Sequence, residues 1–376
     1  MTGLGERIDQ LLASPTYGMA PQERSSTFLG LLKEELEYAG RRNPGFRHYI
    51  ESWPVNPYSA RAVADLPFLP VTMLKAQPPL ALVEPCEIKK VLTSSSTTGQ
   101  LPSRIALDLP TSRRMTKGVV VIVQDFLGPA RRPYLVVDVT GSGGGELELG
   151  ARGTAIRGLQ PFATTVTYCL QPDSAGSLSL DRDTLLKFAE TWGDAPVLVY
   201  GFTYILWKYL VEPLSAENVS LGMKGVHILH SGGWKKLQDE AVDKRSFNNG
   251  LAKVFGCSVD RVIDFYGLVE NVGVIYPDCP EGNKHVPSFG DVIVRDPLTL
   301  EPVAEGGQGI LQVCSVLPTS FPGNLLLTED IAEIVTYDGC RCGRRGTCFR
   351  FVGRVPKAEL RGCGNIERRR RDASDQ

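Results

Sequence analysis

The chain has 376 residues, of which 42% are hydrophobic and 22% charged, so it can build a large core and is not a disordered protein. Basic residues number 41 and acidic residues 42, and this balance argues against a nucleic-acid-binding protein. The length predicts two or three domains, or one large domain built of subdomains.

The sequence also bears on the compartment in which the protein works. No apolar run reaches the roughly 20 residues that a membrane span needs, and residues 1–15 lack the pattern of a secretory signal. The nine cysteines are an odd number, which argues against a disulfide framework. We therefore expect a cytoplasmic protein whose reduced cysteines bind metal, react or pack in the core.

The first part of the chain mixes helices with short strands. Phe28, Leu31, Leu32 and Leu36 recur at helical spacing, and six prolines follow between residues 54 and 79. The predicted elements are a helix at 21–40, a Pro-rich surface wrap with little regular structure, strands at 88–92 and 104–107 around a polar loop, a helix at 112–126 and a strand at 134–139.

The middle of the chain alternates between strands and helices. Strands are predicted at 197–200, 225–229 and 262–266, and helices at 185–192, 204–211 and 240–255. This alternation indicates βαβ units and a parallel sheet. After residue 276 the pattern changes to short strands, at 292–295, 310–316, 331–335 and 349–352. They predict a smaller mixed or antiparallel β subdomain, so the fold class is α/β with this subdomain attached.

A hydroxyl-rich loop follows the strand at 88–92. Its residues are Thr93, Ser94, Ser95, Ser96, Thr97, Thr98 and Gly99. Such a loop offers many O–H and N–H donors to phosphate oxygens, although it is not a Walker loop because G-x-x-x-x-G-K-[ST] is absent. The alternative interpretation is a mobile polar surface loop.

Three further motifs follow in order. Asp264 to Glu270 (D-F-Y-G-L-V-E) closes a predicted strand, at the edge where open α/β sheets bind ligands. Thr328-Glu329-Asp330 and Val352-Gly353-Arg354 lie in the predicted β subdomain. Together with the hydroxyl-rich loop, these motifs resemble, in type and order, those of the adenylate-forming superfamily. The resemblance implies an ATP- and Mg²⁺-dependent enzyme with the large domain of that fold.

The resemblance also implies roles for single residues. Tyr266, followed by Gly267, would stack on adenine, Glu270 would hold Mg²⁺, Asp330 would accept both ribose hydroxyls and Arg354 would meet ribose or phosphate. The chain departs from the superfamily pattern at three places. Ser96 replaces a glycine, Val269 replaces a threonine, and the lysine of the phosphate loop is absent, with Arg104 as its nearest substitute.

A narrower resemblance rests on the segment Ser231-Gly232-Gly233-Trp234-Lys235-Lys236 and on Glu359-Leu360-Arg361-Gly362-Cys363. Both are similar to the acyl-protein synthetases of bacterial bioluminescence fatty-acid reductases. That family implies a fatty acid substrate, acyl transfer to Cys363, and a partner acyl reductase or acyltransferase. Gly232 and Gly233 would contact the nucleotide, and Lys235 the carboxylate or pyrophosphate. Residues 1–352 would form the large domain, with a truncated hinge region and basic tail at 353–376.

A fifth constellation contains soft metal ligands. Cys279 and His285 form one pair, and Cys340 and Cys342 form a second in a C-x-C-G turn. Four such ligands fit a structural Zn²⁺ site, and Cys348 is a possible replacement for one of them. The alternative is a set of reduced, partly buried thiols.

These observations predict an enzyme that activates a carboxylic acid, expected to be a fatty acid, as an acyl-adenylate. Two alternatives stay open. The acid is an aromatic or other acid of secondary metabolism, or the chain is a non-catalytic binding module with this fold. A serine hydrolase is not favoured, since G-x-S-x-G is absent and only four histidines are present.

Overall fold

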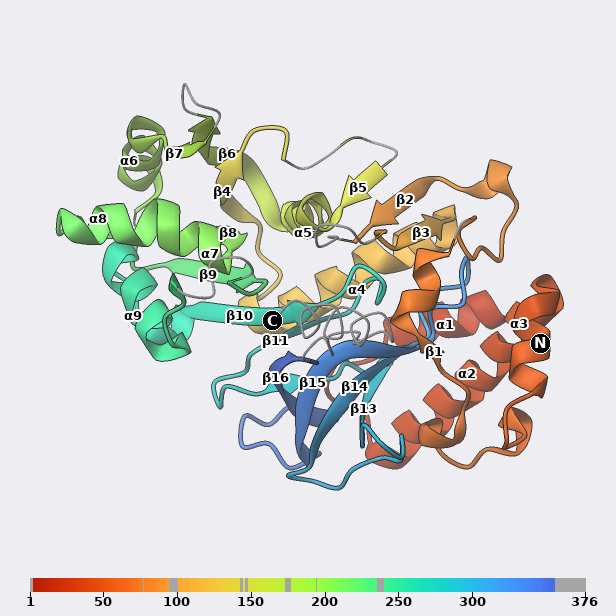
Figure 1. The fold of residues 1–376 in the computed structure, drawn as a ribbon. Helices are drawn as coiled ribbons and strands as arrows, with labels where there is room; N and C mark the ends of the chain where they lie inside the picture. The colour runs from red at the N-terminus through yellow and green to blue at the C-terminus, as the bar shows by residue number, and fades with distance from the viewer. Residues whose placement is uncertain are drawn as a thin grey trace, which may run out of the picture.

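The computed structural model describes residues 3–76, 78–94, 101–142, 145, 148–172, 177–193, 195–234 and 240–355. Figure 1 shows a helix-covered sheet on one side of the molecule, and a second sheet with the N-terminal helices on the other. Among the described helices, none is both long and apolar enough to cross a bilayer.

The first layer is a seven-stranded sheet. Its five inner strands run parallel and its two edge strands antiparallel, which confirms the predicted parallel sheet. In sheet order the strands are β11 (Ile275–Pro277), β10 (Val262–Gly267), β9 (Val226–Ser231), β8 (Val197–Phe202), β4 (Arg132–Val139), β6 (Ala163–Pro172) and β7 (Leu178–Leu180).

Helices cover both faces of this sheet. Alternate residues of β4 point to opposite sides, so Tyr134 and Val136 pack with α4 and α5, whereas Leu135 and Val137 pack with α6 to α9. The helices are α4 (Leu109–Leu127), α5 (Ala151–Leu159), α6 (Arg182–Trp192), α7 (Thr203–Leu206), α8 (Glu212–Ala216) and α9 (Lys244–Phe255). Burial on both faces explains the nearly continuous apolar strands.

The second layer confirms the predicted β subdomain. It is an antiparallel sheet to which one short N-terminal strand adds in parallel. Its strands are β12 (Lys284–His285), β16 (Thr347–Arg354), β15 (Leu325–Tyr337), β14 (Gln308–Ser315), β13 (Gly290–Arg295) and β1 (Leu69–Pro70). A small third sheet has the order β3 (Arg104–Leu107), β2 (Lys90–Thr93), β5 (Glu148–Gly150).

The N-terminal segment corrects one prediction. Helices α1 (Leu4–Leu12), α2 (Pro21–Arg42) and α3 (Pro44–Glu51) pack with the β subdomain in one core. The Pro-rich stretch after them has little regular structure, as predicted, but it is not only a surface wrap. Leu66 and Leu69 are fully buried there, and β1 pairs with β15. The prediction relied on the number of prolines and overlooked the apolar residues between them, which are the residues that pack in the core.

Other differences are local. The helix predicted to start at Glu240 starts at Lys244, because the Asp243 carboxylate accepts the Ser246 N–H at 3.0 Å and caps it. The helix predicted at 204–211 contains a π-helical turn, Trp207–Val211. Sequence patterns did not indicate α1, α3, α5 or β6.

Candidate functional site

Three of the predicted nucleotide-binding residues meet where β10 approaches the antiparallel sheet. The hydroxyl of Tyr266, near the end of β10, donates to Asp330 Oδ2 at 2.7 Å. Arg354 lies opposite Asp330 across the β15–β16 ladder, with its Nε 3.4 Å from Oδ1. Strand pairing therefore brings together an aromatic ring, a carboxylate and a guanidinium that are widely separated in the sequence.

Burial changes the ionisation of this group. Burial raises the pKa of Asp330, and the Tyr266 hydroxyl and the Arg354 charge only partly oppose it. The pKa of Tyr266 is also raised well above its ordinary value, by burial and by the Asp330 charge. The phenol thus stays protonated and donates to the carboxylate. This group of side chains suits a ligand that presents a diol, because the carboxylate accepts hydrogen bonds. The Tyr266 ring is itself stacked on Phe351, with ring centroids 5.4 Å apart.

Glu270 lies just after β10, in a turn that is tightly packed. Its side chain is buried, and the next residue, Asn271, donates from Nδ2 to the Tyr276 hydroxyl at 2.9 Å. Gly273 has φ +79°, and a Cβ there would lie only 2.8 Å from Met115 Cα in α4. Helix α4 and β11 therefore fix the position of the Glu270 backbone. A carboxylate is the right type of ligand for Mg²⁺, and Glu270 is the buried carboxylate that follows Tyr266 by four residues.

The segment after β9 forms the neighbouring part of the same sheet edge. Ser231 Oγ lies 3.0 Å from the Tyr200 hydroxyl. Gly232 has φ +77°, and a Cβ there would lie 2.8 Å from the Phe202 ring, so this turn needs a glycine. Gly232 and Gly233 are exposed at the carboxyl edge, as a nucleotide-binding role requires. Lys235 lies outside the described residues.

The hydroxyl-rich loop is described only at its two ends. Thr93 ends β2, and its Oγ1 donates to the Leu149 carbonyl at 3.4 Å. Ser94 closes the base of the loop, because its Oγ accepts the Ser103 N–H at 2.9 Å. Ser95, Ser96, Thr97, Thr98 and Gly99 lie outside the described residues, as does Cys363.

The structure brings the four predicted soft ligands together. The ligand atoms of Cys279, His285, Cys340 and Cys342 all lie within 4.8 Å of one another. Cys279 Sγ is 3.9 Å from Cys340 Sγ, and Cys342 Sγ is 3.2 Å from His285 Nε2. Tetrahedral zinc with Zn–S bonds of about 2.3 Å would place ligand atoms at similar separations. These four residues have the ligand types and spacing that could hold a metal ion, and we refer to them as the metal-binding group.

Ionisation favours ligation at two members of this group. Burial lowers the pKa of His285 to about 4, and the charge of Arg344 adds to the effect, so the imidazole is neutral. Burial would raise the pKa of Cys340, but hydrogen bonds from the backbone and side chain of Cys342 hold it below its ordinary value. Burial raises the pKa of Cys279 to about 12 and also raises that of Cys348, whose Sγ is 3.8 Å from His285 Nε2. Cys348 is therefore set apart from the other four by its place in the cluster and not by its ionisation.

A buried charge network was not predicted from the sequence. The Lys284 ammonium lies 3.0 Å from Asp264 Oδ2 and 3.1 Å from Asp278 Oδ1. Asp264 Oδ1 in turn lies 3.7 Å from His230 Nδ1 on β9. The pKa of Lys284 is raised, because the two carboxylates outweigh the opposing effect of burial. The network links β9, β10 and β12 through charged side chains. In the sequence, the one hint of this network was Lys284, a lysine directly before the predicted ligand His285.

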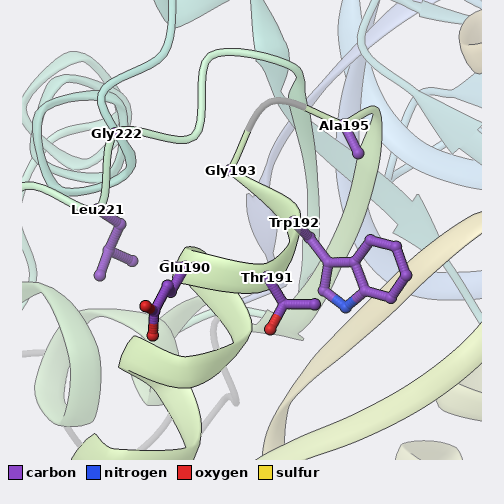
Figure 2. A pocket seen from close by; sticks show the side chains of 8 residues that line it. Glu190, Thr191, Trp192, Gly193, Ala195, Leu221 and Gly222 are labelled. Atoms are coloured by element: carbon purple, nitrogen blue, oxygen red, sulfur yellow. The ribbon is translucent and has the colours of Figure 1, made fainter.

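The surface pocket in Figure 2 lies away from these residues. It is formed by the end of α6 with the turn before β8, and by Leu221 and Gly222 before β9. These segments precede parallel strands, so the pocket is at the opposite edge of the sheet from Tyr266. Among the described residues that line it, Glu190 is the one ionisable residue. The pocket is not part of the candidate site.

Comparisons with known proteins bear on the family and the fold of this chain. Residues 2–370 match the family model described as "Acyl-protein synthetase, LuxE". The chain is 25% identical over 349 residues to the long-chain-fatty-acid–luciferin-component ligase of Vibrio harveyi, covering 91% of this chain and 87% of that protein. It is 26% identical over 326 residues to a phenylacetate–coenzyme A ligase of Thermus thermophilus, covering 83% and 66% of the two chains.

Among solved structures, an open conformation of 2-hydroxyisobutyryl-CoA ligase has the same fold, with a TM-score of 0.69 at 19% identity. The likeness covers 93% of this chain and 79% of that one. The ordered motifs, the shared fold and the family match over nearly the whole length lead to one conclusion. The chain belongs to the LuxE acyl-protein synthetase family and is a carboxylate-adenylating ligase.

Proposed function

We propose that the protein joins a carboxylic acid to ATP, forming an acyl-adenylate and pyrophosphate, and then passes the acyl group to the Cys363 thiol with release of AMP. The observation that carries the proposal is the convergence of Tyr266, Asp330 and Arg354, with the buried Glu270 four residues after Tyr266 in the chain. These residue types match the needs of a nucleoside: an aromatic ring, a diol acceptor and a cation.

The proposed mechanism assigns a task to each residue. Asp330 accepts hydrogen bonds from the ribose and exchanges its Tyr266 partner for them, while Arg354 stays as a charged donor. Glu270 holds Mg²⁺, which neutralises the phosphates when bound. The loop of Thr93 to Gly99, with Gly232 and Gly233, supplies preorganised donors to phosphate oxygens. Lys235 contacts the carboxylate or pyrophosphate.

Two classes of carboxylic acid are candidate substrates. A long-chain fatty acid is supported by the printed name of the Vibrio harveyi relative. An aromatic acid is supported by the Thermus thermophilus relative, whose name includes phenylacetate, and by a group of aromatic side chains beside β9 that is described below. Both acids use the same adenylation residues and differ only in the contacts to the acyl group.

Cys363 is proposed as the acyl carrier because it lies between two glycines near several arginines, where a thiolate is favoured. Cys169 and Cys314 are fully buried with raised pKa values, and burial raises the pKa of Cys257 to about 11. Cys86 differs from these three, because it is exposed in the turn Pro85–Glu87. It is therefore the competitor that an experiment must exclude.

The proposal has two further parts. A thioester on Cys363 needs a consumer, which we propose is a partner acyl reductase or acyltransferase in the cytoplasm, where thiols stay reduced. We also propose that Cys279, His285, Cys340 and Cys342 bind one structural Zn²⁺, because three cysteine sulfurs and a neutral imidazole within 4.8 Å of one another suit zinc, which takes up cysteine as the thiolate. The site lies in the β subdomain, and no step of the reaction passes through it.

The test follows both half-reactions in one set of variants. Wild-type protein is incubated with Mg²⁺, ATP and a panel of labelled acids, and ATP–pyrophosphate exchange and hydroxylamine-sensitive protein label are measured. We expect Asp330→Ala and Glu270→Gln to lower exchange by about 10²–10³-fold, as for other lost contacts to developing charge. Cys363→Ser should keep exchange and lose the label, whereas Cys86→Ser should keep both.

The contrary outcomes are distinct. Near-wild-type exchange in Asp330→Ala and Glu270→Gln would disprove the nucleotide site. A label that persists in Cys363→Ser but disappears in Cys86→Ser would transfer the carrier role to Cys86. Absence of exchange with every acid would support the alternative of a non-catalytic binding module.

A further inference from the structure

His230 is a buried histidine with one ring nitrogen that has no partner among the described residues. The residue is 3% exposed and lies on β9 directly before Ser231, at the edge that carries Gly232 and Gly233. Nε2 is buried and makes no hydrogen bond. A buried polar atom without a partner destabilises the folded state, so such an atom at a ligand-binding edge indicates a missing partner.

The contacts of the other nitrogen define what Nε2 can do. The Ser231 carbonyl, 3.2 Å from Thr203 Oγ1, can take the single proton of this hydroxyl, which leaves Oγ1 free to accept from His230 Nδ1 at 3.0 Å. Asp264 Oδ1 lies 3.7 Å from the same Nδ1 and also favours an N–H there. We therefore assign the proton of the neutral imidazole to Nδ1. Nε2 is a bare acceptor, and its missing partner must be a hydrogen-bond donor.

The surroundings of His230 are aromatic. Its ring centroid lies 4.6 Å from that of Phe247 in α9. Trp207, Trp234 and Phe247 form an aromatic cluster, with centroids 6.0–6.2 Å apart. The two tryptophans are half-buried, so part of the cluster faces outward.

Two local features are needed to build this cluster. Trp207 begins the π-helical turn, a rare geometry that occurs often at functional sites. Gly250 of α9 gives Trp207 room, because a Cβ there would lie 3.0 Å from Trp207 Cζ3. Indole and phenyl rings provide flat apolar contacts that prefer another ring.

We propose that His230 and the aromatic cluster recognise the acyl group, and that the substrate is an aromatic carboxylic acid bearing an uncharged hydroxyl or N–H donor. The inference rests on the proposed adenylation and decides between its two substrate candidates. His230 Nε2 accepts the donor, while the cluster packs against the ring. Sites built to hydrogen-bond a substrate group discriminate strongly against analogues that lack it.

The experiment uses matched acids in the ATP–pyrophosphate exchange assay. The pairs are 4-hydroxyphenylacetate with phenylacetate and indole-3-acetate with 1-naphthylacetate, and dodecanoate represents fatty acids. We expect the donor-bearing acid of at least one pair to be favoured by about 10- to 100-fold in kcat/KM. His230→Leu should reduce that ratio to near one without changing the KM for ATP. His230→Gln, which keeps an acceptor oxygen, should retain part of it, and His48→Gln at an exposed position should leave it unchanged.

Each contrary result has its own meaning. Preference for dodecanoate, or equal use of both acids in each pair, would overturn the inference and leave the proposed adenylation intact. A raised KM for ATP in His230→Leu with an unchanged acid ratio would mean that Nε2 serves the adenine amine, which also overturns it. No exchange with any acid would disprove the proposed function itself. If His230→Leu does not fold, the wild-type ratios and His230→Gln still decide.

Discussion

Buried ionisable side chains determine much of the behaviour of this protein at the scale of single residues. The pKa of Asp330 is raised by burial, whereas that of Asp264 is lowered despite burial, because Lys284 and His230 lie beside it. Glu35 in α2 differs from both. One of its oxygens accepts from Asn324 Nδ2 at 2.6 Å, and the other has no partner among the described residues. The neighbours of a buried carboxylic acid thus decide its role. Asp330 is a candidate ribose acceptor, Asp264 is a member of an ion pair, and Glu35 lowers the stability of the fold when it ionises.

Glu35 provides a prediction on pH and stability. Burial raises the pKa of Glu35 well above its ordinary value, and Arg114 opposes this only partly. The unfolded chain therefore releases this proton first, and stability is lost as pH rises from about 4 towards the folded-state pKa. Glu35→Gln cannot ionise, so we expect it to raise the free energy of unfolding at pH 8 by roughly 1–3 kcal/mol. At pH 4 the two proteins should be nearly equal.

Chemical denaturation at both pH values measures this difference. Glu37→Gln is the control, since the Glu37 side chain is about half exposed and pairs with Arg41 at the surface. An equal effect of Glu35→Gln at pH 4 and pH 8 would mean that ionisation of Glu35 does not limit stability.

At the scale of elements, close backbone approach positions the candidate site. A Cβ at Gly118 of α4 would lie 2.4 Å from the Gly273 carbonyl oxygen and 2.9 Å from Leu317 Cδ1. The turn with Gly273 also carries Glu270, so α4 acts as the support on which this turn rests. Two glycines from distant parts of the chain face each other because neither element leaves space for a side chain.

Gly118→Ala should therefore be harmful although alanine favours helices. We expect a loss of about 1–3 kcal/mol in the free energy of unfolding from overpacking, and lower ATP–pyrophosphate exchange because the Glu270 turn moves. Gly30→Ala in α2 is the matched control, because a Cβ there would meet nothing within 4 Å. That change should stabilise the protein by about 0.5–1 kcal/mol. Similar shifts in both variants would show that the packing of α4 on this turn is loose.

At the scale of the whole molecule, the metal-binding group joins parts of the chain that are far apart. Its ligands come from the segment between β11 and β12, from β12 itself and from the β15–β16 connection. That connection also contacts the other layer. Arg344 pairs with Asp125 at 2.6 Å and lies 4.0 Å above the Phe126 ring of α4, and the Arg345 N–H donates to the Tyr17 carbonyl at 2.9 Å.

Removal of the metal should consequently affect global stability. We expect one Zn²⁺ per chain, and a fall of several kcal/mol in the free energy of unfolding after chelation or in Cys340→Ser, because structural zinc binds with on the order of 10 kcal/mol. Elemental analysis of tag-free protein and thermal unfolding measure the two effects. Cys86→Ser, which removes an exposed thiol elsewhere, should keep both the metal and the melting temperature. Protein that is purified without chelator and contains no zinc would contradict the assignment.

Local patterns in the sequence were enough to predict the two sheets and the motifs that they carry. Strands such as β8 and β10 were recognisable as apolar runs between predicted helices. The candidate site residues Tyr266, Glu270, Asp330 and Arg354 were recognisable because each lies in a short motif, and the motifs occur in the order that the superfamily has. The two pairs of soft ligands, Cys279 with His285 and Cys340 with Cys342, were also predictable as candidates, because the members of each pair lie within a few residues of each other. The spacing of apolar residues and the spacing of residues within a motif are local properties, so they can be read from the sequence alone.

Only the tertiary structure decided which distant residues meet. The Tyr266–Asp330 hydrogen bond, the ion pairs of Lys284, the burial of Glu35 against Asn324 and the bare nitrogen of His230 all join different elements. The exposure of Cys86 and the close contact of Gly118 with Gly273 likewise have no signal in their own segments. The charge and reactivity of a side chain depend on the groups packed around it. Those groups come from distant parts of the chain and become its neighbours only in the folded structure.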